Sequence, residues 1–301
     1  MLTVYKYLTL SFLLFAASNT FAQAPNPLLS AASQAKDLEF PVEPSGISFF
    51  STPRMALHKP DGPGPFPALV LLHQCSGLGE GKSQNASMLE WAKQAVARGY
   101  VALVIDSLGP RGVKTVCGGP QGGVNFVRGA RDALQAAEHL RKFEFVDKKR
   151  IGLAGYSWGA MAGVLASSKR YGAALAPGER FAAVVSFYTG CFTVRPPSGT
   201  SFEIVNSDID RPLLVLMGDK DTETPPAECV ARLEPAKSAA AQVEWHVYPD
   251  ATHCWDCRHL DGFSKKDFRG TPVTYRYDKD VTQDSARRMF EFLDKNMAAK
   301  P

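Results

Sequence analysis

The segment Gly155-Tyr156-Ser157-Trp158-Gly159 has the form G-x-S-x-G and decides how the rest of the chain is interpreted. It follows an apolar run that ends at Ala154 and precedes a run of small residues over 160–167. This order predicts a strand, a sharp turn and a helix, with Ser157 exposed at the tip of the turn as a nucleophile. Strand and helix pass close together there, so the residues two before and two after the serine must be small. Gly155 and Gly159 meet that requirement.

Such a turn also needs backbone N–H groups for the negative charge that develops on the substrate oxygen. It directs the N–H of Trp158 and the start of the following helix toward that charge. We expect a second N–H from the loop 73–77, His-Gln-Cys-Ser-Gly, which directly follows an apolar run over 68–72. Cys75 is the first candidate and Gln74 the next. The alternative interpretation of this loop is an ordinary turn at the exit of a strand.

A serine hydroxyl is a poor nucleophile until a base takes its proton, and this chain has six histidines. His253 alone lies in a loop just after the last apolar strand, in the segment 248–253, Tyr-Pro-Asp-Ala-Thr-His. The acid that orients the histidine should follow the preceding strand, where the chain reads Gly218-Asp219-Lys220-Asp221. Asp221 lies further into the loop and is the expected partner. We expect Asp219, just past the strand, to bond the turn or a neighbour.

Around these segments, short apolar runs alternate with stretches of helical period. Apolar positions at helical spacing predict helices around 89–96, 127–140 and 286–297, and Asp280 with Gln283 is placed as a capping box for the last. Apolar strands that alternate with helices indicate an α/β fold, with a mostly parallel central sheet and helices on both faces. The core strands are predicted at 68–72, 100–105, 151–154, 182–187, 213–217 and 243–248, after short β pieces at 47–50 and 54–58.

The composition is that of an ordinary globular protein, with 301 residues, 45% hydrophobic and 21% charged. This length fits one domain, and neither a repeat nor an interior linker divides the chain. The net charge of +4 is spread over 34 basic and 30 acidic residues and forms no stripe. Nucleic acid is therefore not an expected partner.

The first 22 residues have the form of a secretory signal, with Lys6, an apolar stretch over 7–17 and small residues up to Ala22. The apolar stretch is shorter than the about 20 residues that span a bilayer as a helix. We expect cleavage after Ala22, export to the periplasm or the exterior, and no membrane association of the mature chain. An uncleaved anchor is the alternative. Residues 23–45 are expected to form a loose arm before a single domain over 46–301.

Export changes the interpretation of the six cysteines, because an even number in an oxidising compartment favours disulfides. The segment 253–259, His-Cys-Trp-Asp-Cys-Arg-His, also has the spacing of a zinc site or of a redox C-x-x-C pair. Zinc would take the histidine that the serine needs, and the thioredoxin-like unit that a redox pair usually opens is missing. We therefore expect no metal and no cofactor.

Four segments together resemble the dienelactone hydrolase family: G-Y-S-W-G at 155–159, G-D-K-D at 218–221, Y-P-D-A-T-H at 248–253 and H-Q-C-S-G at 73–77. The resemblance runs from about Pro60 to the C-terminal helix and implies the α/β-hydrolase fold. Ser157, Asp221 and His253 are then the catalytic triad. Two residues depart from the best-known members. Ser157 stands where those enzymes have cysteine, and Gln74 replaces a glutamate linked to activation of the thiol. The chain is therefore similar to a secreted branch with a serine nucleophile.

The resemblance also implies one substrate contact. An arginine of the family, in the loop that matches 106–123, contacts the substrate carboxylate, and Arg111 is similar in position. This implies a preference for anionic esters or lactones. The alternative is an arginine that pairs with Asp106 or faces water.

Disulfide pairing follows in part from the same resemblance, since relatives share a bond equivalent to Cys191–Cys229. A bond between Cys75 and Cys117 would tie the loop 73–77 to the long loop after 105. Cys254–Cys257 is then left by elimination.

Motifs and resemblance together predict an exported serine hydrolase that acts on a small-molecule carboxylic ester or lactone. A peptidase or amidase on the same fold is the first alternative, although such enzymes usually add a cap or propeller domain for which this chain has no room. A secreted binding module that has lost the chemistry is the second alternative. The complete set of triad and oxyanion residues argues against it.

Overall fold

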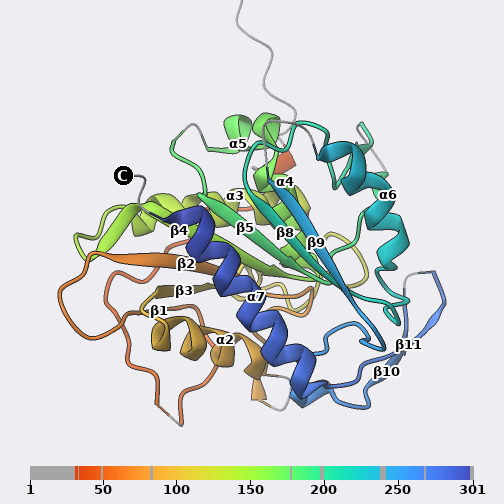
Figure 1. Cartoon of the computed structure of the whole chain (residues 1–301), viewed down its shortest axis with the longest axis horizontal. Helices are drawn as coiled ribbons and strands as arrows, with labels where there is room; N and C mark the ends of the chain where they lie inside the picture. The colour runs from red at the N-terminus through yellow and green to blue at the C-terminus, as the bar shows by residue number, and fades with distance from the viewer. Residues whose placement is uncertain are drawn as a thin grey trace, which may run out of the picture.

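A seven-stranded sheet forms the centre of the computed structural model, which describes residues 31–298 except 33, 49, 82–83, 177, 197–199, 238–241 and 268 (Figure 1). The strand order is β1-β3-β2-β4-β5-β8-β9; β1 runs antiparallel to β3, and every other neighbouring pair is parallel. The strands are β1 (Ala56–His58), β2 (Phe66–Leu72), β3 (Val101–Ile105), β4 (Val146–Tyr156), β5 (Ala183–Phe187), β8 (Leu213–Gly218) and β9 (Val243–Tyr248). All six predicted core strands are present. Residues 47, 48 and 50 are not in a strand.

Helices cover both faces of this sheet, as the alternating pattern predicts. On one face lie α3 (Phe126–Leu140), α4 (Trp158–Ser167), α5 (Lys169–Leu175) and α6 (Pro226–Ala236), and on the other lie α2 (Ala86–Ala97) and α7 (Lys279–Met297). Successive residues of a strand point to opposite faces. In β2, Val70 packs toward α3 and α4, whereas Leu69 and Leu71 pack toward α2 and α7. Each central strand is therefore apolar at nearly every position.

The last helix begins slightly earlier than predicted. Its N-cap is Asp278, whose carboxylate accepts from the N–H groups of Asp280 and Val281. The predicted capping box of Asp280 and Gln283 is therefore wrong, because Asp280 already lies in the first turn of α7. Among the described residues, no helix combines the length and the hydropathy needed to cross a bilayer.

The predicted signal segment 1–22 lies outside the described residues, and so does the start of the predicted arm 23–45. The described part of that arm is not loose, which corrects the expectation. Ala32 is fully buried, and its carbonyl accepts from Arg128 of α3 at 2.8 Å. The carbonyl of Pro41 lies 2.9 Å from Nε2 of His139 in the same helix. Hydrogen bonds to the carbonyls of Ala32 and Pro41 therefore fasten this part of the arm to α3, and further along the chain the N–H of Ser45 donates to the carbonyl of Leu57 in β1 at 2.7 Å.

The parallel arrangement gathers the loops after β2, β4, β5, β8 and β9 at one edge of the sheet. The chain between β9 and α7 adds a short antiparallel hairpin at this end, made of β10 (Ser264–Lys266) and β11 (Pro272–Thr274). Figure 1 shows it beside the arrowhead of β9. Another two-stranded ribbon, β6 (Thr193–Val194) with β7 (Phe202–Glu203), follows β5 in the chain.

Candidate active site

Ser157 lies between the end of β4 and the start of α4, with φ 51° and ψ −110°. A positive φ is costly for a residue other than glycine, so neighbouring groups must hold it. The N–H of Ser157 donates to the carbonyl of Phe187 in β5 at 3.0 Å. A side chain at Gly155 would lie 2.2 Å from the carbonyl oxygen of Gly159. One at Gly159 would lie 2.3 Å from that of Leu72. The predicted turn is present and requires both glycines.

The structure brings the three predicted triad residues into one line of hydrogen bonds. Nε2 of His253 lies 3.0 Å from Oγ of Ser157, and Nδ1 lies 2.7 Å from Oδ2 of Asp221. All three side chains are buried. A carboxylate can only accept, so Asp221 fixes the imidazole proton on Nδ1. The lone pair of Nε2 then faces the hydroxyl of Ser157, which is the geometry for taking a proton from serine.

The surroundings of His253 set its charge. Burial alone would lower the pKa of the imidazole, but the carboxylates of Asp221 and Glu223 outweigh burial and raise the pKa above its usual value. The neutral base is therefore populated at higher pH than in a free imidazole.

Asp221 rather than Asp219 contacts the histidine. Oδ1 of Asp221 accepts from the N–H groups of Glu223 (3.0 Å) and Thr224 (2.9 Å), and Oδ2 accepts from the Thr224 hydroxyl (2.6 Å). Asp219 lies at the strand end, where its N–H donates to the carbonyl of Tyr248 and its carboxylate lies 3.6 Å from Nζ of Lys220. The turn that follows Asp221 thus holds its carboxylate in place.

Thr224 and Tyr188 are among the residues of the site that were not singled out from the sequence. The hydroxyl of Thr224 lies 3.2 Å from Nδ1 of His253 as well as beside Asp221. The ring of Tyr188, a residue with φ 41°, lies 4.7 Å from the His253 ring, and its carbonyl oxygen lies 3.1 Å from the oxygen of the Thr224 hydroxyl. A Thr three residues after an Asp is a turn signal, and Tyr188 directly follows β5 at the carboxyl edge. These two sequence features could have pointed to Thr224 and Tyr188.

The loop after β2 lies against the turn, since the carbonyls of Leu72 and His73 crowd Gly159. Nε2 of His73 accepts from the N–H of Ser107 at 3.0 Å, so its proton is on Nδ1, which donates to the carbonyl of Gln74 at 2.6 Å. In a trans peptide the N–H points away from the carbonyl, so the N–H of Cys75 points away from His73. Within the described part of the chain this N–H has no hydrogen-bond partner. It is therefore free to donate to a substrate oxygen.

The side chain of Gln74 points into the protein rather than toward solvent. Its Nε2 donates to the Tyr188 hydroxyl at 3.3 Å, and its Oε1 accepts from Asn85. Gln74 thus connects the loop after β2 to the tyrosine that packs on the histidine. A neutral amide here adds no negative charge beside the predicted oxyanion position.

Arg111 lies in the short 3₁₀ turn Gly109–Arg111. Within the described part of the chain, its guanidinium contacts groups that hold neighbouring segments together. Nη1 and Nη2 donate to both carboxylate oxygens of Asp132, at 2.7 and 2.8 Å. Nε and Nη2 donate to the carbonyl of Lys36, and Nη1 donates to that of Ser107. A guanidinium has five N–H donors, and all five are used. This corrects the expectation that Arg111 contacts a substrate carboxylate.

All six cysteines are paired as predicted, in Cys75–Cys117, Cys191–Cys229 and Cys254–Cys257. The first bond joins the loop after β2 to the loop after β3. Cys254 and Cys257 lie beside the carboxylate of Asp256, but their sulfurs are bonded to each other and offer no thiolate to a metal ion.

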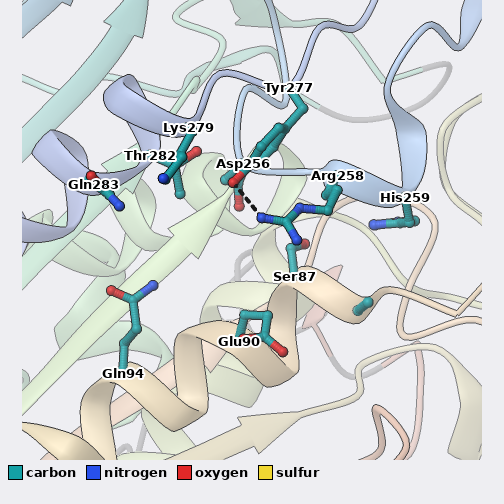
Figure 2. A pocket seen from close by; sticks show the side chains of 11 residues that line it. Ser87, Glu90, Gln94, Asp256, Arg258, His259, Tyr277, Lys279, Thr282 and Gln283 are labelled. Carbon is teal, nitrogen blue, oxygen red and sulfur yellow. Dashed lines mark hydrogen bonds between the residues drawn. The ribbon is translucent and has the colours of Figure 1, made fainter.

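A separate hollow, with a volume of about 530 Å³, is lined by residues of α2, of the loop after His253 and of α7 with the segment before it (Figure 2). No triad residue lines it. Its link to the site is Asp256, whose buried carboxylate accepts from Nε1 of Trp91 (2.7 Å) and from the Tyr188 hydroxyl (2.8 Å). Burial raises the pKa of Asp256. The lining residues are Ala86, Ser87, Glu90, Gln94, Asp256, Arg258, His259, Tyr277, Lys279, Thr282 and Gln283.

Comparison with known families identifies the chain. Residues 54–297 match the model of the dienelactone hydrolase family. The chain belongs to this family. It is therefore a carboxylic ester hydrolase of the dienelactone hydrolase type, as the four sequence segments predict. No curated protein matches it in sequence.

Solved structures show which fold this dienelactone hydrolase has. A candidate dienelactone hydrolase from Klebsiella pneumoniae subsp. pneumoniae MGH 78578 is 16% identical, with 78% of this chain and 89% of that chain covered and a TM-score of 0.57. Esterase 2 of Thermogutta terrifontis with bound propionate is 18% identical, with 82% and 91% covered and a TM-score of 0.57. The α/β hydrolase MGS-M1 from a Medee basin deep-sea metagenome library is 18% identical, with 78% and 86% covered and a TM-score of 0.52. The predicted α/β-hydrolase fold is confirmed.

Proposed function

We propose that this dienelactone hydrolase is an exported serine hydrolase that cleaves a small carboxylic ester or lactone through an acyl-enzyme on Ser157. The observation that carries the proposal is the hydrogen-bonded line of Asp221, His253 and Ser157, with distances of 2.7 and 3.0 Å. A buried carboxylate, an imidazole and a strained serine at a strand-to-helix turn together form a nucleophile with its own base.

In the first half of the reaction, Oγ of Ser157 attacks the ester carbonyl while Nε2 of His253 takes the hydroxyl proton. The oxyanion of the tetrahedral intermediate accepts from the N–H groups of Trp158 and Cys75, with that of Gln74 as the other candidate. The bond to the leaving oxygen then breaks, and His253 returns the proton to the departing alcohol. In a lactone that alcohol stays attached to the acyl group.

In the second half, His253 takes a proton from water, which attacks the acyl-enzyme. Collapse of the second intermediate releases the carboxylic acid and restores the Ser157 hydroxyl. Asp221 keeps its hydrogen bond to Nδ1 and stabilises the imidazolium that forms in each half. Each step uses groups of the protein and water only.

A serine mechanism agrees with the residue at position 74. A carboxylate there is linked in relatives to activation of a thiol, and a serine nucleophile has no thiol to activate. Gln74 keeps hydrogen bonds to Tyr188 and Asn85 without adding a negative charge.

The proposed export is supported by the form of residues 1–22 and by three disulfides, which persist in oxidising compartments. N-terminal sequencing of the processed protein tests it. We expect the mature chain to begin at Gln23, and a chain that retains Met1 would contradict the proposal.

A fluorophosphonate probe tests the mechanism directly. We expect covalent labelling at Ser157 in the native chain and none in Ser157→Ala. A panel of esters, lactones and matched amides then separates an esterase from the peptidase alternative, since an esterase should release the ester and lactone products and leave the amides intact.

A further inference from the structure

A second carboxylate, Glu223, lies beside the reacting end of His253. Its Oε2 is 4.0 Å from Nε2, the nitrogen that also faces Ser157. The side chain of Glu223 is 15% exposed, so it is neither sealed in the core nor free in solvent. The triad does not use it, because Asp221 contacts the opposite nitrogen of the ring.

Neighbouring groups hold Glu223 in place and keep it ionised. Nζ of Lys265 donates to Oε1 at 2.8 Å, and the Tyr275 hydroxyl donates to Oε2 at 2.8 Å. Burial alone would raise the pKa of this carboxyl, but the positive charges on His253 and Lys265 outweigh burial and hold the pKa below its usual value. The oxygen nearest the reaction therefore carries negative charge, and the ammonium of Lys265 is bonded to the other oxygen.

The hairpin β10–β11 supplies one of these two partners, and Tyr275 directly follows it. Lys265 lies in β10, opposite Val273 of β11. The Tyr275 ring lies 5.5 Å from the ring of His253. Arg269, in the turn between the strands, donates to the carbonyl of Glu223 at 2.8 Å. The hairpin is thus fastened to the loop that carries Glu223.

The proposed mechanism places the alcohol portion of a substrate next to this carboxylate. Nε2 of His253 returns its proton to the departing oxygen, so that oxygen must come within hydrogen-bond distance of Nε2. Substituents on the alcohol then lie within a few ångströms of Oε2 of Glu223. A like charge in that position is repelled, and a hydroxyl or ammonium group gains an acceptor.

We propose that Glu223 is a specificity-determining residue that selects esters whose alcohol portion is neutral or carries a hydroxyl or ammonium group, and that it excludes those with a carboxylate there. This inference rests on the proposed function, since it uses the leaving-group side of the Ser157 reaction. Lys265 acts in the opposite sense, because it partly neutralises the carboxylate.

Three acetate esters of phenols that carry an anionic, a neutral or a cationic group at the same ring position provide the test: 3-acetoxybenzoate, its methyl ester and 3-acetoxy-N,N,N-trimethylanilinium. Release of acetate is the readout for all three. Glu223→Gln should raise kcat/KM for the anion relative to the neutral ester by about tenfold, and lower that for the cation by a similar factor. Lys265→Met should shift both ratios in the opposite direction. Tyr275→Phe removes a hydrogen bond to Glu223 but leaves the charges of Glu223 and Lys265, so it should change kcat/KM for all three substrates by the same factor.

The first two variants should shift the kcat/KM ratios in opposite directions, and this difference distinguishes an effect of charge from damage to the hairpin. If Glu223→Gln changes all three esters equally, or if Lys265→Met shifts the ratios in the same direction as Glu223→Gln, Glu223 is only an anchor and the inference is wrong. Should Glu223→Gln not fold, the sign of the Lys265→Met shift still decides. If the native chain is labelled by the fluorophosphonate and hydrolyses the neutral ester, but neither Glu223→Gln nor Lys265→Met changes the kcat/KM ratios, this inference is wrong and the proposed function still stands. A native chain that does neither overturns both.

Discussion

The guanidinium of Arg111 and the carboxylate of Asp132 meet through two parallel hydrogen bonds, Nη1 to Oδ2 at 2.7 Å and Nη2 to Oδ1 at 2.8 Å, with both side chains buried. Asp132 has a second cation, since Nε of Arg128 donates to Oδ1 at 2.8 Å. The pair joins the loop after β3 to α3, and through the carbonyl of Lys36 it also holds the N-terminal arm.

Replacing Arg111 by alanine should therefore lower stability rather than change substrate choice. Removing one partner of a buried ion pair costs about 3–5 kcal/mol, and we expect about 3 kcal/mol here because Arg128 remains. Urea unfolding measures this loss, with the exposed Arg287→Ala as the control. A selective fall in kcat/KM for an anionic ester, with an unchanged free energy of unfolding, would mean that Arg111 contacts the substrate after all.

Ser157→Ala should abolish ester hydrolysis without unfolding the chain. Only the oxyanion groups and substrate binding then remain, so we expect a loss of about three or more orders of magnitude in kcat. His253→Ala should lose nearly as much. Steady-state rates on an activated ester measure the loss, and thermal unfolding checks the fold. More than a few per cent of the native rate in Ser157→Ala would show that the nucleophile lies elsewhere.

Asp221→Asn should be far more damaging than Asp219→Asn. An asparagine beside Nδ1 can present a donor instead of an acceptor, which favours the tautomer with the proton on Nε2, where it blocks proton transfer from Ser157. We expect a fall of about three to four orders of magnitude in kcat for Asp221→Asn and little change for Asp219→Asn. The two rates are compared on one neutral ester. The reverse order would make Asp219 the acid.

Activity should rise with pH through the titration of His253, since only the neutral imidazole takes the proton. The pKa of His253 is raised from the usual 6.5, mainly because the carboxylates of Asp221 and Glu223 outweigh burial. A raised pKa keeps the base protonated to higher pH, so the midpoint of kcat/KM should lie above 6.5 and activity should be lost as the pH falls through it. Glu223→Gln removes one of the two carboxylates and should lower the midpoint. A midpoint that stays unchanged would mean that Glu223 does not act on the base.

Two disulfides of similar span allow a matched comparison. Cys75–Cys117 closes 42 residues and Cys191–Cys229 closes 38, so loss of either should cost a similar stability of about 4 kcal/mol. The double alanine variant of the first pair should also lower kcat, because it frees the loop that carries the Cys75 N–H. The corresponding variant of the second pair should keep kcat. Equal kcat values in the two variants would argue against Cys75 as an oxyanion donor.

Elements with a strong local pattern were predictable from the sequence. The turn at Ser157 has fixed residue types on both sides, and the core strands are apolar at nearly every position because both faces are covered. Asp221 and His253 follow from their places after successive strands. The parallel sheet brings such loops to one edge whatever else the chain does.

Features that depend on distant partners were not predictable. Arg111 pairs with Asp132, 21 residues away, and with the carbonyl of Lys36, 75 residues away. The residues around Arg111 do not indicate either partner. The arm looked loose because its small polar residues carry no pattern, yet Arg128 and His139 of α3 bind its carbonyls. The strands of the hairpin β10–β11 have three residues each, too few for an alternation to be recognised.

The crowding around the elbow glycines limits how this enzyme can evolve. Every single-base change at the first or second position of a glycine codon either adds a β-carbon or ends the chain, and a β-carbon at Gly155 or Gly159 would lie 2.2 or 2.3 Å from a backbone oxygen. Nearly all such mutations at these two codons are therefore lost, whatever ester the organism meets. We expect adaptation to a new ester to come from segments such as the hairpin β10–β11, where Ser264, Lys266 and Thr274 are exposed and a new side chain has room.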